Sequence, residues 1–155
     1  MKIISGSVKE TISIGKSLAL SLQKGDIVCL FGDLGSGKTV LTKGISSGLG
    51  VKPGKILSPT FVLLRRYGGK VPVYHFDLYR LNDPKDILGI GYEEYFFDEG
   101  ISVIEWADRL GYYMPKEFLK IKLEISGEKR RTLKFTATGR HYRRLLEKLN
   151  EDIGG

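Results

Sequence analysis

The chain has 155 residues, of which 41% are hydrophobic and 28% charged, values ordinary for a soluble globular protein that buries a core. It has no apolar run of transmembrane length and no secretory-signal pattern, and its single cysteine, Cys29, excludes an intrachain disulfide. We therefore expect a cytoplasmic protein without a membrane segment, folded as a single domain over residues 1–155.

The net charge of +7 is compatible with an anionic partner, such as nucleic acid or an acidic protein surface. A solvated basic face explains the charge equally well, because the basic residues are not regularly interleaved with aromatic ones and no known nucleic-acid motif is present. The sequence leaves both interpretations open. Much of the excess lies late in the chain, at Lys129, Arg130, Arg131, Arg140, Arg143, Arg144 and Lys148.

The first third of the chain predicts a helix, a buried strand and a second helix. Residues 11–22 are expected to be helical, because apolar side chains recur on one face at i, i+4 and i+8. Residues 27–31 form a continuous apolar run, which is typical of a buried strand. The second helix is expected over residues 40–49 and should end near Gly48-Leu49-Gly50, where glycine can supply a left-handed cap.

The remainder alternates between strand patterns and short helical patterns. Period-2 alternation and apolar runs predict strands, a glycine pair and a Ser-Gly-Glu sequence predict turns, and Asn-Asp-Pro marks a helix start. The expected elements are a loop over 52–59, strands over 61–67 and 71–76, short helices over 86–88 and 92–96, a strand over 101–104, a helical turn over 106–110, strands over 120–125 and 133–137, a helix over 140–149 and a frayed tail over 151–155.

Residues 32–39, Gly-Asp-Leu-Gly-Ser-Gly-Lys-Thr, fit the phosphate-binding pattern G-x-x-x-x-G-K-[ST]. The loop lies between the predicted buried strand and the next helix, where backbone N–H groups and the helix dipole point at one anion. Lys38 is expected to reach the β- and γ-phosphates of a nucleotide, and the Thr39 hydroxyl to ligate Mg²⁺. A glycine-rich turn before a helix is the alternative. The predicted fold class is α/β, a single P-loop NTPase-like domain with a mixed parallel and antiparallel sheet flanked by helices.

Two carboxylates follow apolar runs in the way that phosphoryl-transfer sites require. Asp77 follows the run 73–76, and Glu105 follows 101–104. Both are expected at the carboxyl ends of strands, the edge at which open α/β sheets bind ligands. One would ligate the metal, and the other would position the attacking water. Solvent-exposed strand ends or ordinary caps are the alternatives.

Three further residues are weaker candidates. Thr60, after Ser58-Pro59, is either a switch residue that senses the γ-phosphate or part of a turn that proline builds. His75 lies inside a predicted strand, where a packed or hydrogen-bonded role is favoured over catalysis. Trp106 directly follows Glu105, so it either belongs to the core or covers a nucleotide pocket.

Together these motifs resemble the TsaE (formerly YjeE) family of small bacterial ATPases, over roughly residues 1–137. The Ser-Pro-Thr and His-Phe-Asp-Leu-Tyr-Arg signatures are far more specific than the phosphate loop. The matching segments are residues 32–39, Ser58-Pro59-Thr60-Phe61, His75-Phe76-Asp77-Leu78-Tyr79-Arg80-Leu81 and Ile104-Glu105-Trp106.

The resemblance implies a role in making N6-threonylcarbamoyladenosine in tRNAs that read ANN codons. Family members act with TsaB and TsaD, of which TsaD performs the transfer to adenosine. The TsaE protein hydrolyses ATP with Mg²⁺ and supports turnover of that complex. The resemblance leaves direct contact with tRNA open.

The resemblance also implies roles for individual residues. Thr39 and Glu105 would ligate Mg²⁺, and Asp77, Thr60 and Trp106 match positions tied to activity. Thr11 matches a region near the nucleotide base. The residues expected to contact the nucleotide are Thr11, Gly35, Ser36, Gly37, Lys38, Thr39, Val40 and Trp106.

The alternatives to an ATPase of this family are a small-molecule P-loop kinase and a nucleotide-dependent RNA-binding module. A kinase of this size usually carries an arginine-bearing lid, whereas the basic residues 129–131 fall in a predicted hairpin turn. A GTPase is disfavoured because the Asn-Lys-x-Asp base-recognition motif is absent. An RNA-binding module would explain the charge but leave the phosphate loop without a use. Since no arginine finger is evident, we expect slow hydrolysis without a partner.

Overall fold

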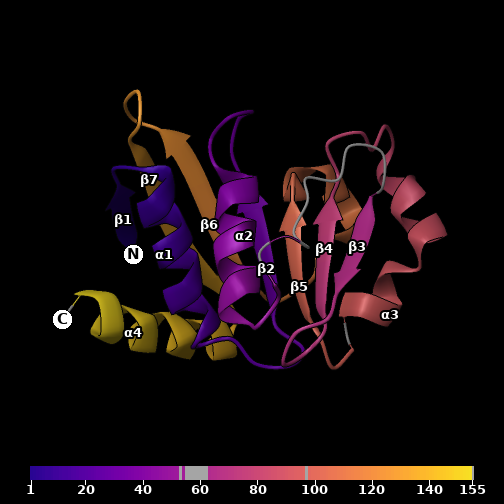
Figure 1. Cartoon of the computed structure of the whole chain (residues 1–155). Helices are drawn as coiled ribbons and strands as arrows, with labels where there is room; N and C mark the ends of the chain where they lie inside the picture. The colour runs from indigo at the N-terminus through magenta and orange to yellow at the C-terminus, as the bar shows by residue number, and fades with distance from the viewer. Residues whose placement is uncertain (53, 55–62, 97, 155) are drawn as a thin grey trace.

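A single mixed sheet organises the part of the chain that the computed structural model describes, residues 1–52, 54, 63–96 and 98–154 (Figure 1). Within these residues the sheet has seven strands in the order β1-β7-β6-β2-β5-β4-β3. The strands are β1 (Lys2–Ser5), β2 (Ile27–Phe31), β3 (Leu64–Tyr67), β4 (Val73–Asp77), β5 (Ile101–Glu105), β6 (Phe118–Ile125) and β7 (Arg131–Thr138). The helices are α1 (Val8–Ala19), α2 (Lys38–Gly48), α3 (Tyr92–Phe96) and α4 (Arg140–Gly154), with 3₁₀ helices η2 (Pro84–Ile90) and η3 (Ala107–Tyr113).

The centre of the sheet is parallel and its flanks are antiparallel. Strand β2 pairs in parallel with both β5 and β6, and β4 pairs in parallel with β5. Strand β3 runs antiparallel to β4, β7 to β6, and β1 to β7. This arrangement confirms the predicted mixed α/β sheet, and it brings the carboxyl ends of β2, β4 and β5 to one edge.

The two faces of the sheet carry separate cores. Helices α1 and α2 lie side by side on one face, and α3 lies toward the β3 side of the molecule (Figure 1). Alternate residues of β2 face opposite ways, as a strand requires. Val28 and Leu30 pack with α1, α2 and α4, whereas Ile27 and Cys29 pack with η2, α3 and η3.

Close helix packing fixes the position of α2, which begins at the phosphate loop. A Cβ atom at Gly44 of α2 would lie 2.4 Å from the carbonyl oxygen of Ile12, and one at Gly15 of α1 would lie 2.7 Å from the backbone nitrogen of Ile45. The two backbones therefore approach more closely than side chains would allow. Since α1 in turn packs on the sheet, α2 has little freedom to shift along it.

The predicted N-terminal half needs two corrections. Strand β1, which pairs with β7 at the sheet edge, was not predicted. The first helix spans Val8–Ala19 rather than residues 11–22, because the Ser7 hydroxyl accepts a hydrogen bond from the N–H of Glu10 (3.1 Å) and caps the helix earlier.

In the rest of the described chain, most predicted elements are present with shifted ends. Helix α2 begins at Lys38 rather than residue 40. The largest error concerns the C-terminus, where α4 continues to Gly154 and the predicted end at 149 and frayed tail are wrong. Buried Leu145 and Leu149 anchor this helix on the core that includes β7. Among the described residues, no helix combines the length and apolar character that crossing a membrane requires.

Candidate active site

The loop over residues 32–37 joins the carboxyl end of β2 to the first turn of α2. Gly37 is the N-cap of α2 with φ +102°, and it makes no side-chain cap hydrogen bond. The first N–H groups of the helix therefore have no side-chain cap. At Gly32, a Cβ atom would lie 2.5 Å from the carbonyl oxygen of Leu123. Only glycine fits at that position.

The Lys38 side chain lies against the inner side of the loop and is only 5% exposed. Its Nζ donates hydrogen bonds to the carbonyl oxygens of Gly32 (2.6 Å) and Asp33 (2.9 Å) and to the Ser36 Oγ (3.3 Å). Burial lowers the pKa of Lys38, and the negative charge of Glu105 opposes this shift. The Lys38 ammonium group therefore lies inside the loop, where phosphate oxygens could take the place of the Gly32 and Asp33 carbonyl oxygens as its hydrogen-bond acceptors.

A chain of hydrogen bonds crosses from α2 to β3 through the buried carboxylate of Glu105. The Thr39 Oγ1 donates to Glu105 Oε1 at 2.7 Å, and Glu105 Oε2 contacts His75 Nε2. On its other side, His75 Nδ1 lies 3.0 Å from the Tyr67 hydroxyl. A carboxylate can only accept, so His75 carries a hydrogen on Nε2 and fixes the orientation of Glu105.

Asp77 lies beside Glu105, because the last residues of β4 and β5 are paired in register. Its Oδ1 accepts a hydrogen bond from the N–H of Tyr79 at 3.1 Å. Burial raises the pKa of Asp77, the negative charge of Glu105 raises it further, and the Tyr79 hydrogen bond opposes the rise. The site therefore holds two neighbouring carboxyl groups in different surroundings.

Trp106 has a backbone conformation that bulky residues rarely adopt. Its φ of +57° and ψ of +42° are left-handed, which costs about 1–2 kcal/mol for a residue with a Cβ atom. This conformation follows Glu105 directly and turns the indole toward Lys38, whose Nζ lies 4.0 Å from the ring centroid. The Tyr79 ring packs against the same indole at 5.0 Å. The strained backbone of Trp106 therefore lies beside the phosphate loop.

The remaining predicted residues differ in placement. Thr11 is buried in α1, and its Oγ1 lies 2.7 Å from the Ser5 Oγ, so its hydroxyl is engaged within the fold. Val40 lies half-buried in the first turn of α2. Thr60 lies outside the described residues, as does the rest of its Ser-Pro-Thr motif.

Two residues near the site make contacts that the sequence did not specify. The favoured interpretation of His75 as a packed or hydrogen-bonded residue is confirmed, and its partners are Glu105 and Tyr67. Strand periodicity held the signal, since His75 and Asp77 share one face of β4 and Glu105 ends the neighbouring strand. Arg131 was assigned to a hairpin turn, but its guanidinium reaches the carbonyl oxygen of Gly35. No local sequence pattern predicts that contact, because Gly35 and Arg131 are 96 positions apart in the chain.

The residues at this edge of the sheet suit a nucleoside triphosphate with Mg²⁺. Among the described residues there is no cluster of three or more His, Cys, Asp or Glu placed to hold a metal ion. Mg²⁺ does not need one, because it is commonly held by one or two protein oxygens together with substrate phosphates and waters. The adjacent oxygens of Thr39 and Glu105 provide that kind of donor pair.

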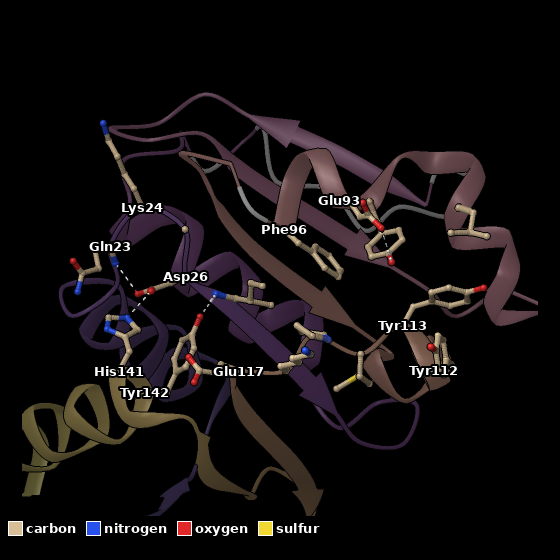
Figure 2. Close-up of a pocket in the computed structure, with 17 residues that line it drawn as sticks. Gln23, Lys24, Asp26, Glu93, Phe96, Tyr112, Tyr113, Glu117, His141 and Tyr142 are labelled. Carbon is tan, nitrogen blue, oxygen red and sulfur yellow. Dashed lines mark hydrogen bonds and ion pairs between the residues drawn. The ribbon is translucent and has the colours of Figure 1, made fainter.

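A concavity of about 980 Å³ lies at the other end of the parallel strands (Figure 2). It is bordered by the start of β2, α3, the end of η3 and the start of α4. Figure 2 shows the buried Asp26 between two partners: its Oδ2 accepts from the N–H of Gln23 (2.8 Å), and its Oδ1 lies 2.7 Å from His141 Nε2. This contact ties α4 to the sheet.

Because the Asp26 carboxyl is buried, we expect it to make the stability of the fold depend on pH. Burial raises its pKa, and the hydrogen bonds of Gln23 and His141 oppose the rise. Because the raised pKa means that folded Asp26 binds a proton more tightly than unfolded Asp26 does, the contribution of this residue to stability falls as the pH rises above about 4. Asp26→Asn should therefore gain stability relative to the wild type over that range, measured by urea unfolding at several pH values.

Asp152→Asn, on the exposed side of α4, is the control for this prediction, and its stability difference from the wild type should stay constant over the same pH range. Parallel pH curves for Asp26→Asn and the wild type would contradict the proposed linkage.

Comparison with known proteins assigns the chain to a family. The family model described as "Threonylcarbamoyl adenosine biosynthesis protein TsaE" matches residues 5–133. The chain belongs to the TsaE family. The matched range of this TsaE-family chain includes the phosphate loop, Asp77, Glu105 and Trp106, and it ends before α4.

Curated relatives and a solved structure agree with this TsaE assignment. The chain is 40% identical over 143 residues to the tRNA threonylcarbamoyladenosine biosynthesis protein TsaE of Bacillus subtilis, covering 92% of this chain and 89% of the relative. It is 36% identical to the protein of that name from Treponema pallidum, covering 86% and 98%. The crystal structure of Bacillus subtilis YdiB superimposes with a TM-score of 0.82 at 35% identity, covering 98% of this chain and 95% of that one. The predicted P-loop NTPase-like fold is thereby confirmed.

Proposed function

We propose that this chain is a cytoplasmic ATPase that supports formation of N6-threonylcarbamoyladenosine in tRNA, acting with TsaB and TsaD. The pathway follows from the names of the TsaE relatives. The observation that supports ATP hydrolysis most is the contact between Thr39 and Glu105, 2.7 Å apart, beside a phosphate loop that holds Lys38. A binding module without chemistry would not require a buried carboxylate against the loop hydroxyl.

In the proposed bound state, the loop N–H groups and the first turn of α2 would surround the β-phosphate. Lys38 would exchange the carbonyl oxygens of Gly32 and Asp33 for phosphate oxygens. Thr39 and Glu105 would hold Mg²⁺, which supplies positive charge against the developing negative charge on the phosphates. His75 would keep the Glu105 carboxylate in its orientation.

We assign the water-orienting role to Asp77, because Glu105 is already occupied by Thr39 and His75. The attacking water would form a bond to the γ-phosphorus as the bond to the β,γ-bridging oxygen breaks, giving ADP and inorganic phosphate. The water's proton would pass through the Asp77 carboxylate to solvent. The raised pKa of Asp77 makes it a stronger base than an exposed aspartate.

The single tryptophan offers a direct readout of nucleotide binding. ATP should draw the Lys38 ammonium group away from the Trp106 ring, now 4.0 Å from it, and so change the emission of Trp106. We expect a saturable change during an ATP titration of the wild type and none in Lys38→Ala. Unchanged emission at ATP concentrations that saturate binding by calorimetry would contradict the assigned movement of Lys38.

The function is tested by phosphate release from ATP, measured for the chain alone and with TsaB and TsaD. We expect slow release alone and faster release with both partners, because the Arg131 guanidinium is engaged with carbonyl groups rather than directed at a phosphate. Fast hydrolysis by the isolated chain that the two partners leave unchanged would count against the proposed coupling.

A further inference from the structure

Arg131, the first residue of β7, connects the β6–β7 hairpin to the phosphate loop. Its Nε and Nη2 both donate to the carbonyl oxygen of Gly35, at 3.3 and 3.1 Å. The same guanidinium holds the hairpin itself, because Nη1 donates to the carbonyl oxygens of Gly127 (3.2 Å), Glu128 (3.4 Å) and Arg130 (2.9 Å). One side chain therefore fixes two loops that are far apart in sequence.

The crest of the phosphate loop has little packing of its own. Leu34 is 71% exposed, and a Cβ atom placed at Gly35 would meet no atom of the described residues within 4 Å. Gly35 also has a left-handed backbone conformation, with φ +82°. As a glycine it has no side chain whose contacts could restrain the backbone there. Among the described residues, packing does not hold the crest on that side, whereas the forked pair of hydrogen bonds from the Arg131 side chain does.

The charge of Arg131 is also available to the loop. The ion pairs among the described residues do not include Arg131, whose partners are all main-chain carbonyls. A cation that binds the Gly35 carbonyl polarises the Gly35–Ser36 peptide, whose N–H group donates to the carbonyl oxygen of Asp33 at 3.0 Å, and so strengthens this turn of the loop. Both the restraint and the charge favour a bound polyphosphate.

We propose that Arg131 is a positioning residue that holds the phosphate loop in its nucleotide-binding conformation and thereby sets the affinity for ATP. This inference rests on the proposed ATP binding. It requires the guanidinium fork, since only a planar group with several donors can serve the Gly35 carbonyl and the hairpin carbonyls together. A lysine retains the charge at this position but cannot make the same set of bonds.

The test compares Arg131→Gln, Arg131→Lys and the matched control Arg130→Gln, which removes the same charge from the neighbouring, exposed position of the hairpin. The dissociation constant for ATP is measured by calorimetry. We expect Arg131→Gln to weaken binding about tenfold, the scale of a hydrogen bond to a charged group. Arg131→Lys should recover only part of this loss, and Arg130→Gln should stay within about twofold of the wild type.

Thermal unfolding with and without ATP separates positioning from a merely structural role. If Arg131 positions the loop, its substitution should reduce the increase in melting temperature that ATP produces. It should also raise KM for ATP with little change in kcat. If Arg131 were merely structural, its substitution would lower the melting temperature equally with and without ATP.

Three results would overturn the inference: wild-type affinity in Arg131→Gln, wild-type affinity in Arg131→Lys, or an equal loss in Arg130→Gln. If the wild type itself bound no ATP, the proposed function would fail instead.

Discussion

Replacement of Glu105 by Gln is expected to lower the rate of ATP hydrolysis by about 10²–10³-fold, the effect typical of removing one preorganised charged group from an active site. The carboxylate would lose its negative charge toward Mg²⁺ while the side chain keeps its shape. ATP binding through Lys38 and the loop N–H groups should fall much less. The loss should therefore be found in kcat rather than in the dissociation constant.

The fold should tolerate Glu105→Gln despite the burial of this side chain. The Gln carbonyl oxygen can still accept from the Thr39 hydroxyl, as Oε1 does in the wild type. Its amide can donate to His75 Nε2 if the imidazole moves its hydrogen to Nδ1 and donates to the Tyr67 hydroxyl, 3.0 Å away. Both buried partners thus remain satisfied.

Single-turnover phosphate release and circular dichroism measure these two expectations for Glu105→Gln. Glu124→Gln is the control, because Glu124 lies on the exposed face of β6, where its ion pairs among the described residues are with Lys122 and Lys134 rather than with the loop. Hydrolysis by folded Glu105→Gln within threefold of the wild type would remove Glu105 from the proposed metal site.

Lys38→Ala is expected to weaken ATP binding by about 100-fold, because the ammonium group would make charge-assisted hydrogen bonds worth about 1.5–3 kcal/mol each with the phosphates. The substitution also removes the only side chain bonded to the carbonyls of Gly32 and Asp33 in the described structure. Those carbonyls can bind water in an open loop, so the cost in stability should be small.

Calorimetric titration with ATP measures the loss in Lys38→Ala, and Lys43→Ala is the matched control because Lys43 is exposed on the same helix. The control should bind ATP as the wild type does. Comparable affinity in Lys38→Ala and the wild type would mean that the loop binds phosphate without this lysine, contrary to the proposed site.

The sequence predicts the middle of this fold better than its edges. Strand β2 is a continuous apolar run and β5 is apolar except for Ser102 and its final Glu105, a composition typical of a strand covered on both faces, so both strands could be located together with the carboxylate that ends β5. Strand β1 has four residues in an edge position, with Lys2 and Ile4 exposed. A short edge strand needs little hydrophobic pattern, because its stability comes from pairing with β7.

The same contrast holds for the candidate site. Lys38, Thr39 and Glu105 could be proposed because each follows a local pattern, a loop signature or the end of an apolar run. The roles of His75 and Arg131 depend on which strands are neighbours, since β3, β4 and β5 create the Tyr67–His75–Glu105 contacts and the β6–β7 hairpin brings Arg131 to Gly35. Strand order is a tertiary property that single-sequence periodicity does not contain.

The central claim is that ATP hydrolysis at this site supports repeated tRNA modification by a partner complex. The most direct test is the number of threonylcarbamoyladenosine products formed per TsaB–TsaD complex, measured with no added chain, with the wild type and with Glu105→Gln. We expect multiple turnovers only with the wild type. Equal turnover in all three reactions would contradict it.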